Sequence, residues 1–484
     1  MTKSPLFMSC EEFERLGLKT LALAAGHMAD QERTPVHRDL PEETRQQLMS
    51  LPLADRGLAP EDILSFLNDT LLRYPLGNGH RQFFAWINPP PAPIGVLADT
   101  LSNSVNATSD GFEHAGTYLQ VSTGRWLMEL CGFPTEGSLA LFLSGGSMAN
   151  LTALAGARHK AAKTAGWNLR EDGLQGGHKR LVLYTSDQSH SSVQKAVELL
   201  GLGNRNLRAV PSDDAFRMRV DALEAAIQND LVAGHQPFCV VAVAGSTNTG
   251  AIDPLEAIAD CCRRHGLWFH VDGAYGALGR LDPDYAPLYR GVERADSLVL
   301  DPHKRLMVPV DCGVVFLRDP ALQREAFSLV PAYLQSETPG GAPMAHEYML
   351  PLTYANRVIK TWATVARLGR SGTRDLILRG HSLAQNLAQR VERAPELELL
   401  APPSLSIVCF RYRPAGLEDE AKIDSFNSAL IERLCADGEV FLTATEVAGK
   451  TSLRVCIMHY DAEVKDIDAL LSAVHRVGRE LIEG

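Results

Sequence analysis

The stretch Asp301-Pro302-His303-Lys304 decides the architecture of this chain, together with the apolar run Ser297–Leu300 that precedes it. An earlier apolar run, Leu267–Val271, is followed directly by Asp272. Short apolar runs of this length are typical of buried strands in a parallel sheet. Ligands of such sheets bind at the carboxyl ends of the strands, which is where Asp272 and Lys304 fall. We therefore expect an α/β fold with a ligand site that contains both side chains.

The apolar runs recur between residues 95 and 375 and are separated mostly by stretches with helical periodicity. They are Leu139–Leu143, Leu181–Tyr184, Cys239–Ala244, Leu267–Val271, Ser297–Leu300 and Gly313–Leu317. Alternating strands and helices predict a mainly parallel sheet with helices on both faces. We expect three parts: an N-terminal helical segment (1–90), a large α/β domain (91–375) and a small C-terminal α+β domain (376–484). Strands at 406–412 and 452–458 and helices at 418–436 and 464–481 are expected in the last part.

Composition limits the class of protein. The 484 residues are 45% apolar and 22% charged, as in ordinary globular proteins. A net charge of −11 and the absence of a Lys/Arg block argue against a nucleic-acid surface. Without a long apolar segment, neither a membrane span nor a signal peptide is expected. Nine scattered cysteines favour reduced thiols in a cytoplasmic protein over a disulfide framework, and no metal site is expected.

A lysine and an aspartate at the ends of two strands suit pyridoxal 5'-phosphate. The Lys304 amine can form a Schiff base with the cofactor aldehyde, and Asp272 can hold a proton on the pyridine nitrogen. Desolvation at a strand end favours the neutral amine that this chemistry requires. If each motif is considered alone, Lys304 could be an ordinary surface lysine and Asp272 an aspartate that caps a helix. The presence of both motifs favours the cofactor site.

Three further strand ends carry groups that suit the same cofactor. Gly146 and Ser147 form a turn before a helix, where free N–H groups and the helix dipole can bind phosphate. His190 can stack on the cofactor ring, and Thr247 can donate a hydrogen bond to it. The small residue Ala274 would let the ring lie flat. The alternatives are a plain turn at Gly146 and Ser147, a helix cap at His190 and a polar loop at Thr247. With Asp272 and Lys304, however, five strands of one sheet end in such groups, which favours a single site.

These motifs resemble those of the group II pyridoxal-phosphate decarboxylases, the family of aromatic-L-amino-acid, histidine and glutamate decarboxylases. The resemblance runs from about residue 80 into the C-terminal domain. It implies an enzyme of fold type I with a seven-stranded type of central sheet, which acts as a homodimer with sites at the subunit interface. It assigns Lys304 to the Schiff base, Asp272 to the pyridinium, His190 and Ala274 to the two ring faces, and Gly146, Ser147 and His303 to the phosphate.

The resemblance also gives the reaction a direction. Decarboxylation must end with return of a proton to Cα, and in the family a tyrosine on a mobile loop provides it. The matching residue is Tyr333, followed by the Gly/Pro-rich stretch 335–343. Relatives that form aldehydes have phenylalanine at this place, so Tyr333 favours an amine product. Oxidative deamination to an aldehyde remains the alternative, and an ordinary packing tyrosine is the other interpretation of Tyr333.

The substrate is the least determined feature. Trp86 and Ile87 match the region that lines the side-chain pocket in relatives, and they favour an aromatic L-amino acid. Acidic and diamino acids stay open. Three departures from the family pattern weaken the transfer of substrate identity: Arg305 in place of an aromatic residue, and the altered segments 113–120 and 351–357. A non-catalytic scaffold is disfavoured because the cofactor residues are present.

Overall fold

A seven-stranded sheet forms the centre of the structure, a computed structural model that describes residues 4, 6–107, 114–175, 178–329 and 342–483. The strand order is β1-β7-β6-β5-β4-β2-β3. All neighbours are parallel except those of β7, which runs antiparallel to both β1 and β6. The strands are β1 (Leu139–Leu143), β2 (Leu181–Ser186), β3 (Leu207–Val210), β4 (Gln236–Val243), β5 (Trp268–Asp272), β6 (Ser297–Leu300) and β7 (Gly313–Leu317).

The direction of the strands explains how the strand-end motifs meet. Since β1 and β6 both oppose β7, they point the same way as β2, β4 and β5. The carboxyl ends of these five strands therefore lie at one edge of the sheet. The expected mainly parallel α/β fold is confirmed.

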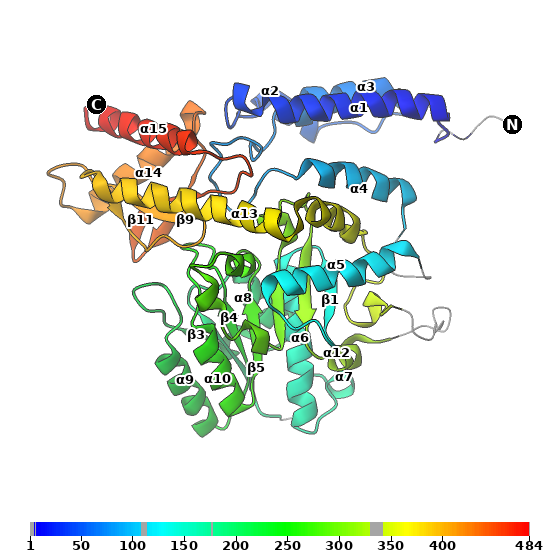
Figure 1. Ribbon diagram of the computed structural model, residues 1–484, viewed down its shortest axis with the longest axis vertical. Coiled ribbons are helices and arrows are strands. Elements are labelled where there is room, and N and C mark those ends of the chain that lie inside the picture. Colours follow the sequence, from blue (N-terminus) through cyan, green and yellow to red (C-terminus); the bar gives the residue numbers. More distant parts are fainter. Residues whose placement is uncertain (1–3, 5, 108–113, 176–177, 330–341, 484) are drawn as a thin grey trace.

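Helices cover both faces of this sheet (Figure 1). One face packs against α6 (Gly146–Thr164), α8 (Ser191–Leu199) and α12 (Pro320–Phe327), and the other against α5 (Ala115–Cys131), α9 (Val220–Val232) and α10 (Leu255–His265). Strand side chains alternate between the two cores: Leu181 and Leu183 join the first, and Val182 and Tyr184 the second. Burial on both faces explains why these strands are continuous apolar runs in the sequence. Two short helices, α7 (Leu169–Asp172) and α11 (Pro302–Arg305), complete this part.

A second, antiparallel sheet has the order β10-β11-β9-β8. It consists of β8 (Leu397–Leu399), β9 (Ile407–Tyr412), β10 (Thr443–Val447) and β11 (Lys450–Cys456), with α14 (Glu420–Asp437) and α15 (Val464–Glu483) packed in the same core. The long helix α13 (Arg357–Arg393) contacts α4 and α5 at one end and this sheet at the other. Its backbone is kinked at Gly369, where φ is 61°. Because α13 passes through position 375, the domain boundaries stay a prediction.

The N-terminal helices lie along the upper side of the molecule in Figure 1. They are α1 (Cys10–Asp30), α2 (Glu42–Met49), α3 (Pro60–Leu67) and α4 (Pro93–Val105). Proline followed by acids starts α2 and α3, because an acid in the first turn interacts favourably with the helix dipole. Among the described residues, no helix is both long enough and apolar enough to cross a membrane. All nine cysteines are unpaired.

Candidate active site

A cavity of about 290 Å³ lies at the carboxyl edge of the large sheet. Its walls come from the segments that follow β1, β2, β4, β5 and β6. The structure thus gathers around one space the eight residues predicted to bind the cofactor: Gly146, Ser147, His190, Thr247, Asp272, Ala274, His303 and Lys304.

Lys304 projects from the short helix α11, directly after β6. Its Nζ lies 3.0 Å from Asp301 Oδ2, and Asp301 is buried. The other carboxylate oxygen, Asp301 Oδ1, is buried and has no hydrogen-bond partner among the described residues. The neighbouring His303 is held by a 2.5 Å hydrogen bond between the His303 Nδ1 and the Cys312 carbonyl oxygen. Asp301 was not predicted as a site residue, although its spacing to Lys304 is that of one helical turn.

Asp272 is the last residue of β5 and is 7% exposed. Its Oδ1 accepts a hydrogen bond from the Ala274 amide at 3.1 Å, and its Oδ2 accepts one from Asn150 Nδ2 at 2.9 Å. A buried carboxylate without such partners would be costly. These two bonds fix the carboxylate plane toward the cavity that it lines. Asn150, which also lines the cavity, was not predicted as a site residue. It could have been found from the sequence because it lies one helical turn beyond Gly146 on α6.

A buried hydrogen-bond network continues behind Asn150. Because the Asn150 amide nitrogen donates to Asp272, its Oδ1 must accept, and it lies 2.9 Å from His270 Nε2. His270 therefore carries its proton on Nε2, and its Nδ1 accepts from Ser297 Oγ at 2.7 Å. Burial lowers the pKa of His270 to about 4, against the opposing effect of Asp272. A neutral imidazole thus supports the carboxamide that orients Asp272.

The pKa of His270 predicts a pH dependence of stability. The unfolded chain has a histidine pKa near 6.5, so between pH 6.5 and 4 it binds more protons at this position than the folded chain. The free energy of unfolding should therefore fall as pH falls through this window, by about 3 kcal/mol at the acid end. His270→Gln should flatten this slope in denaturant titrations at pH 7 and 4.5. Exposed His178→Gln is the control; equal slopes in both variants would contradict the assignment.

His190 combines two of the roles weighed from the sequence. It is the N-cap of α8, where its Nδ1 accepts from the Ser192 amide at 3.2 Å and lies 2.9 Å from Ser192 Oγ. The ring also lines the cavity. Burial lowers the pKa of His190, so the neutral ring with its proton on Nε2 is favoured.

The start of α6, which also lines the cavity, suits a phosphate. Gly145, with φ 136°, leads into α6, and its helix has no side-chain cap, so the first N–H groups are available to an anion. A Cβ atom on Gly146 would lie 2.9 Å from Asp301 Oδ2 and 3.2 Å from Ala274 Cβ, which explains the glycine. An anion site, a buried carboxylate and a lysine around one cavity fit pyridoxal 5'-phosphate.

Trp86 and Ile87 do not line this cavity. Trp86 has φ 51° and is 47% exposed, with its ring beside Phe83 and Phe441. Its carbonyl accepts from Arg454 Nη1 at 3.0 Å, whereas Arg454 Nε donates to the Thr247 carbonyl at 2.9 Å. Ile87 packs against the main core. Tyr333 lies outside the described residues, so its role stays a prediction.

The departure at Arg305 has a structural explanation. The side chain is 5% exposed and does not line the cavity. Its Nη1 donates to Ser406 Oγ at 2.7 Å, its Nη2 donates to the Ile377 carbonyl at 3.3 Å, and the guanidinium lies over the Tyr275 ring. Arg305 thus joins the segment of Lys304 to helix α13 and to the start of the C-terminal sheet, and it lies behind Tyr275, which lines the cavity.

Comparison with known proteins agrees with this geometry. Residues 41–413 match the family model described as the pyridoxal-dependent decarboxylase conserved domain. The aromatic-L-amino-acid decarboxylase of Bacillus atrophaeus is 32% identical over 98% of this chain and 97% of that protein. The L-2,4-diaminobutyrate decarboxylase of Acinetobacter baumannii is 30% identical over 88% and 85%.

A solved structure of Oryza sativa TDC with PLP and tryptamine superposes with a TM-score of 0.92, at 25% identity, over 99% of this chain and 100% of that one. Other relatives bear the names acidic amino acid decarboxylase, from Homo sapiens, and phenylacetaldehyde synthase, from Petunia hybrida. They are 28% and 29% identical over 91% and 94% of this chain, and 86% and 92% of their own lengths. The names of these relatives therefore differ in substrate and in product.

Proposed function

This chain belongs to the family of pyridoxal-dependent decarboxylases, and on that premise we propose that it converts an aromatic L-amino acid into the corresponding amine and CO₂. It is a carboxy-lyase that uses pyridoxal 5'-phosphate, which accepts the electron pair left when the bond to the carboxylate breaks.

The positions of the cavity residues support a different role for each of them. Lys304 would hold the cofactor covalently, and Asp272, oriented by Asn150, would keep a proton on the pyridine nitrogen. The neutral His190 ring and Ala274 would cover the two faces of the cofactor ring. The phosphate would lie at the start of α6, near Gly146, Ser147 and His303, and Thr247 would bond the ring substituents.

Trp86 is the observation that favours an aromatic substrate. Its indole is half exposed although its backbone is fixed by the same arginine that fixes the Thr247 loop. A rigid, exposed indole offers a stacking surface to an aromatic side chain. The name and coverage of the Bacillus atrophaeus relative point the same way.

Because Trp86 does not line the cavity of its own chain, its proposed role requires a homodimer in which it faces the partner's site. Apolar side chains on the N-terminal helices support an interface there: Phe13 and Leu18 on α1 and Leu101 on α4 are all well exposed. Light scattering of the purified protein at twice the chain mass would support the dimer, and a monomer mass would exclude it.

A substrate screen tests the proposed function. The purified holoenzyme is offered aromatic, acidic and diamino L-amino acids, and CO₂, amine and peroxide are all measured. Aromatic acids should give the highest kcat/KM, with amine and CO₂ in equal amounts. A preference for glutamate-like or 2,4-diamino acids would reject the aromatic proposal and leave the decarboxylase assignment intact.

The second candidate product is an aldehyde, which the relative named phenylacetaldehyde synthase keeps open. Here Tyr333 is the discriminating residue, because a phenol can return a proton to Cα and phenylalanine cannot. Tyr333→Phe should preserve cofactor absorbance but lower amine formation by roughly 10²-fold or more, the usual contribution of a positioned acid, with aldehyde and peroxide rising. Unchanged amine output in this variant would remove Tyr333 from the reaction.

A further inference from the structure

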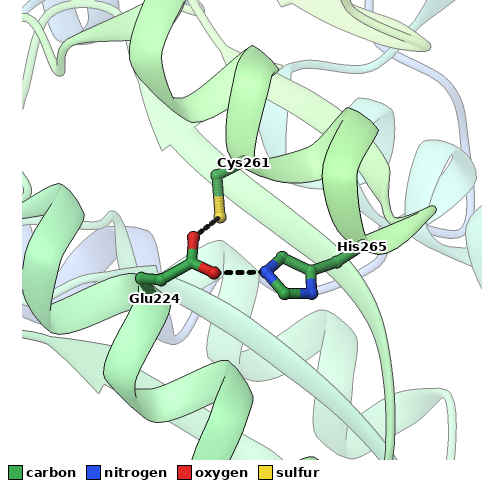
Figure 2. Close-up of side chains that lie close together, drawn as sticks. All are labelled: Glu224, Cys261 and His265. Atoms are coloured by element: carbon green, nitrogen blue, oxygen red, sulfur yellow. Dashed lines mark hydrogen bonds and ion pairs between the residues drawn. The ribbon is translucent and has the colours of Figure 1, made fainter.

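Three side chains of the types that bind transition metals meet between α9 and α10 (Figure 2). Cys261 and His265 are one helical turn apart on α10 and so lie on the same face, and Glu224 reaches them from α9. One ligand atom from each residue lies within 4.8 Å of the other two. No metal site was expected from the sequence, although Cys261 and His265 have the Cys-x₃-His spacing of one helical turn.

The contacts within this cluster centre on the carboxylate. Cys261 Sγ donates to Glu224 Oε2 at 3.3 Å, and His265 Nε2 lies 2.5 Å from Glu224 Oε1. Arg264 Nη2 also donates to Oε2, at 2.8 Å. Arg264, with His265, holds the pKa of Glu224 at about 2, whereas burial and the nearby carboxylate raise the pKa of Cys261 to about 12. The cluster is therefore an ionised carboxylate that attracts cations, beside a protonated and buried thiol.

The cluster is separate from the cofactor cavity. His265 ends α10 just before β5 begins at Trp268, whereas Asp272 ends β5. The cluster is thus near the amino end of that strand, and the cofactor cavity is at its carboxyl end. None of its three residues lines the cavity.

From this convergence we propose that Glu224, Cys261 and His265 form a binding site for a divalent cation of the Zn²⁺ class. Thiolate, imidazole and carboxylate are together the ligand set that Zn²⁺ prefers, and three protein ligands leave a fourth position for water. Magnesium and calcium prefer oxygen ligands and do not match a thiol and an imidazole.

Binding of the metal ion requires that protons and the Arg264 guanidinium leave the three ligand groups. The Cys261 S–H bond breaks and its proton goes to solvent, while the sulfur electron pair binds the metal. His265 uses the Nε2 lone pair, so its remaining proton moves to Nδ1, and Arg264 leaves the carboxylate for solvent. The bound ion links α9 to α10. Because it binds the folded chain, it should raise the melting temperature of the protein.

Cobalt(II) tests this site directly because a cysteine thiolate bound to Co²⁺ gives an intense near-ultraviolet charge-transfer band. Holoenzyme is titrated with Co²⁺ and then with Zn²⁺ as competitor, and proton release and melting temperature are followed in parallel. The expected result is one thiolate–Co²⁺ band per chain, lost on adding Zn²⁺, with release of the thiol proton. No such band in the wild-type holoenzyme would overturn the proposal.

Four variants make the test specific to this cluster. Cys261→Ser and His265→Ala should each weaken Co²⁺ binding by at least about tenfold. Loss of a residue that only supports a metal ligand already lowers metal affinity by about that factor in other proteins. Arg264→Gln should tighten it, since the competing guanidinium is gone. Cys262→Ser, which alters the adjacent buried thiol outside the cluster, should leave the band unchanged. If Cys261→Ser retains the band, the cation binds elsewhere and the proposal is wrong.

Discussion

Lys304→Ala should abolish the covalent link to the cofactor and lower kcat by roughly 10⁴- to 10⁶-fold, the scale seen when a covalent catalytic group is removed. The lysine is the cavity's only lysine among the described residues, and its amine is held 3.0 Å from the buried Asp301. Without it, the cofactor aldehyde has no amine to bond in this cavity. The measurement is borohydride reduction of the holoenzyme followed by peptide mass analysis, alongside steady-state decarboxylation.

Lys195→Ala is the matched control for this prediction. Lys195 is an exposed lysine on α8, near His190 but outside the cavity. Its loss should leave both the reduced adduct and the turnover at wild-type levels. An adduct that persists on another lysine in Lys304→Ala would show that the cofactor is attached elsewhere.

Asp272→Asn should have the next largest effect, a fall in kcat of roughly 10²- to 10⁴-fold, the range found for a single well-placed proton or charge. An amide keeps the shape of the side chain and its bond from the Ala274 amide, but it has no negative charge to keep the pyridine nitrogen protonated. The cofactor should still bind through Lys304. Absorbance of the bound cofactor and kcat are therefore both measured.

Asn150→Ala provides the graded comparison for Asp272. It removes the donor to Asp272 Oδ2 but leaves the carboxylate, so its effect on kcat should be clearly smaller than that of Asp272→Asn. If Asp272→Asn keeps wild-type turnover, the pyridine nitrogen is not the partner of this residue.

The large sheet was predictable because its strands are buried on both faces. Runs such as Ser297–Leu300 and Gly313–Leu317 have the same bounds in the sequence interpretation and in β6 and β7. Strands that were missed lack this signal. The edge strand β3 and the strand β10 leave side chains exposed, and β8 has three residues, so none forms an apolar run. Tertiary pairing, and not local sequence, determines them.

The site was predictable where a residue directly follows a strand and was missed where it depends on contacts between distant segments. Lys304 and Asp272 have the strand before them as a signal. The pairing of Asn150 with Asp272 and with His270 joins α6 to β5 across more than a hundred residues, and no local pattern announces it. The place of Trp86 outside the cavity likewise depends on how the N-terminal segment packs against β11.

Two buried arginines limit how this enzyme can be recombined with its relatives. Arg454 on β11 holds the backbone of Trp86 and of the Thr247 loop, and Arg305 beside Lys304 holds Ser406. The C-terminal segment is therefore not an interchangeable module. A chimaera that takes residues beyond 400 from a relative must keep a hydroxyl at 406, because without it the buried Arg305 loses a hydrogen-bond acceptor beside Lys304. It must also keep an arginine at 454, because without it the carbonyls of Trp86 and Thr247 lose their donor.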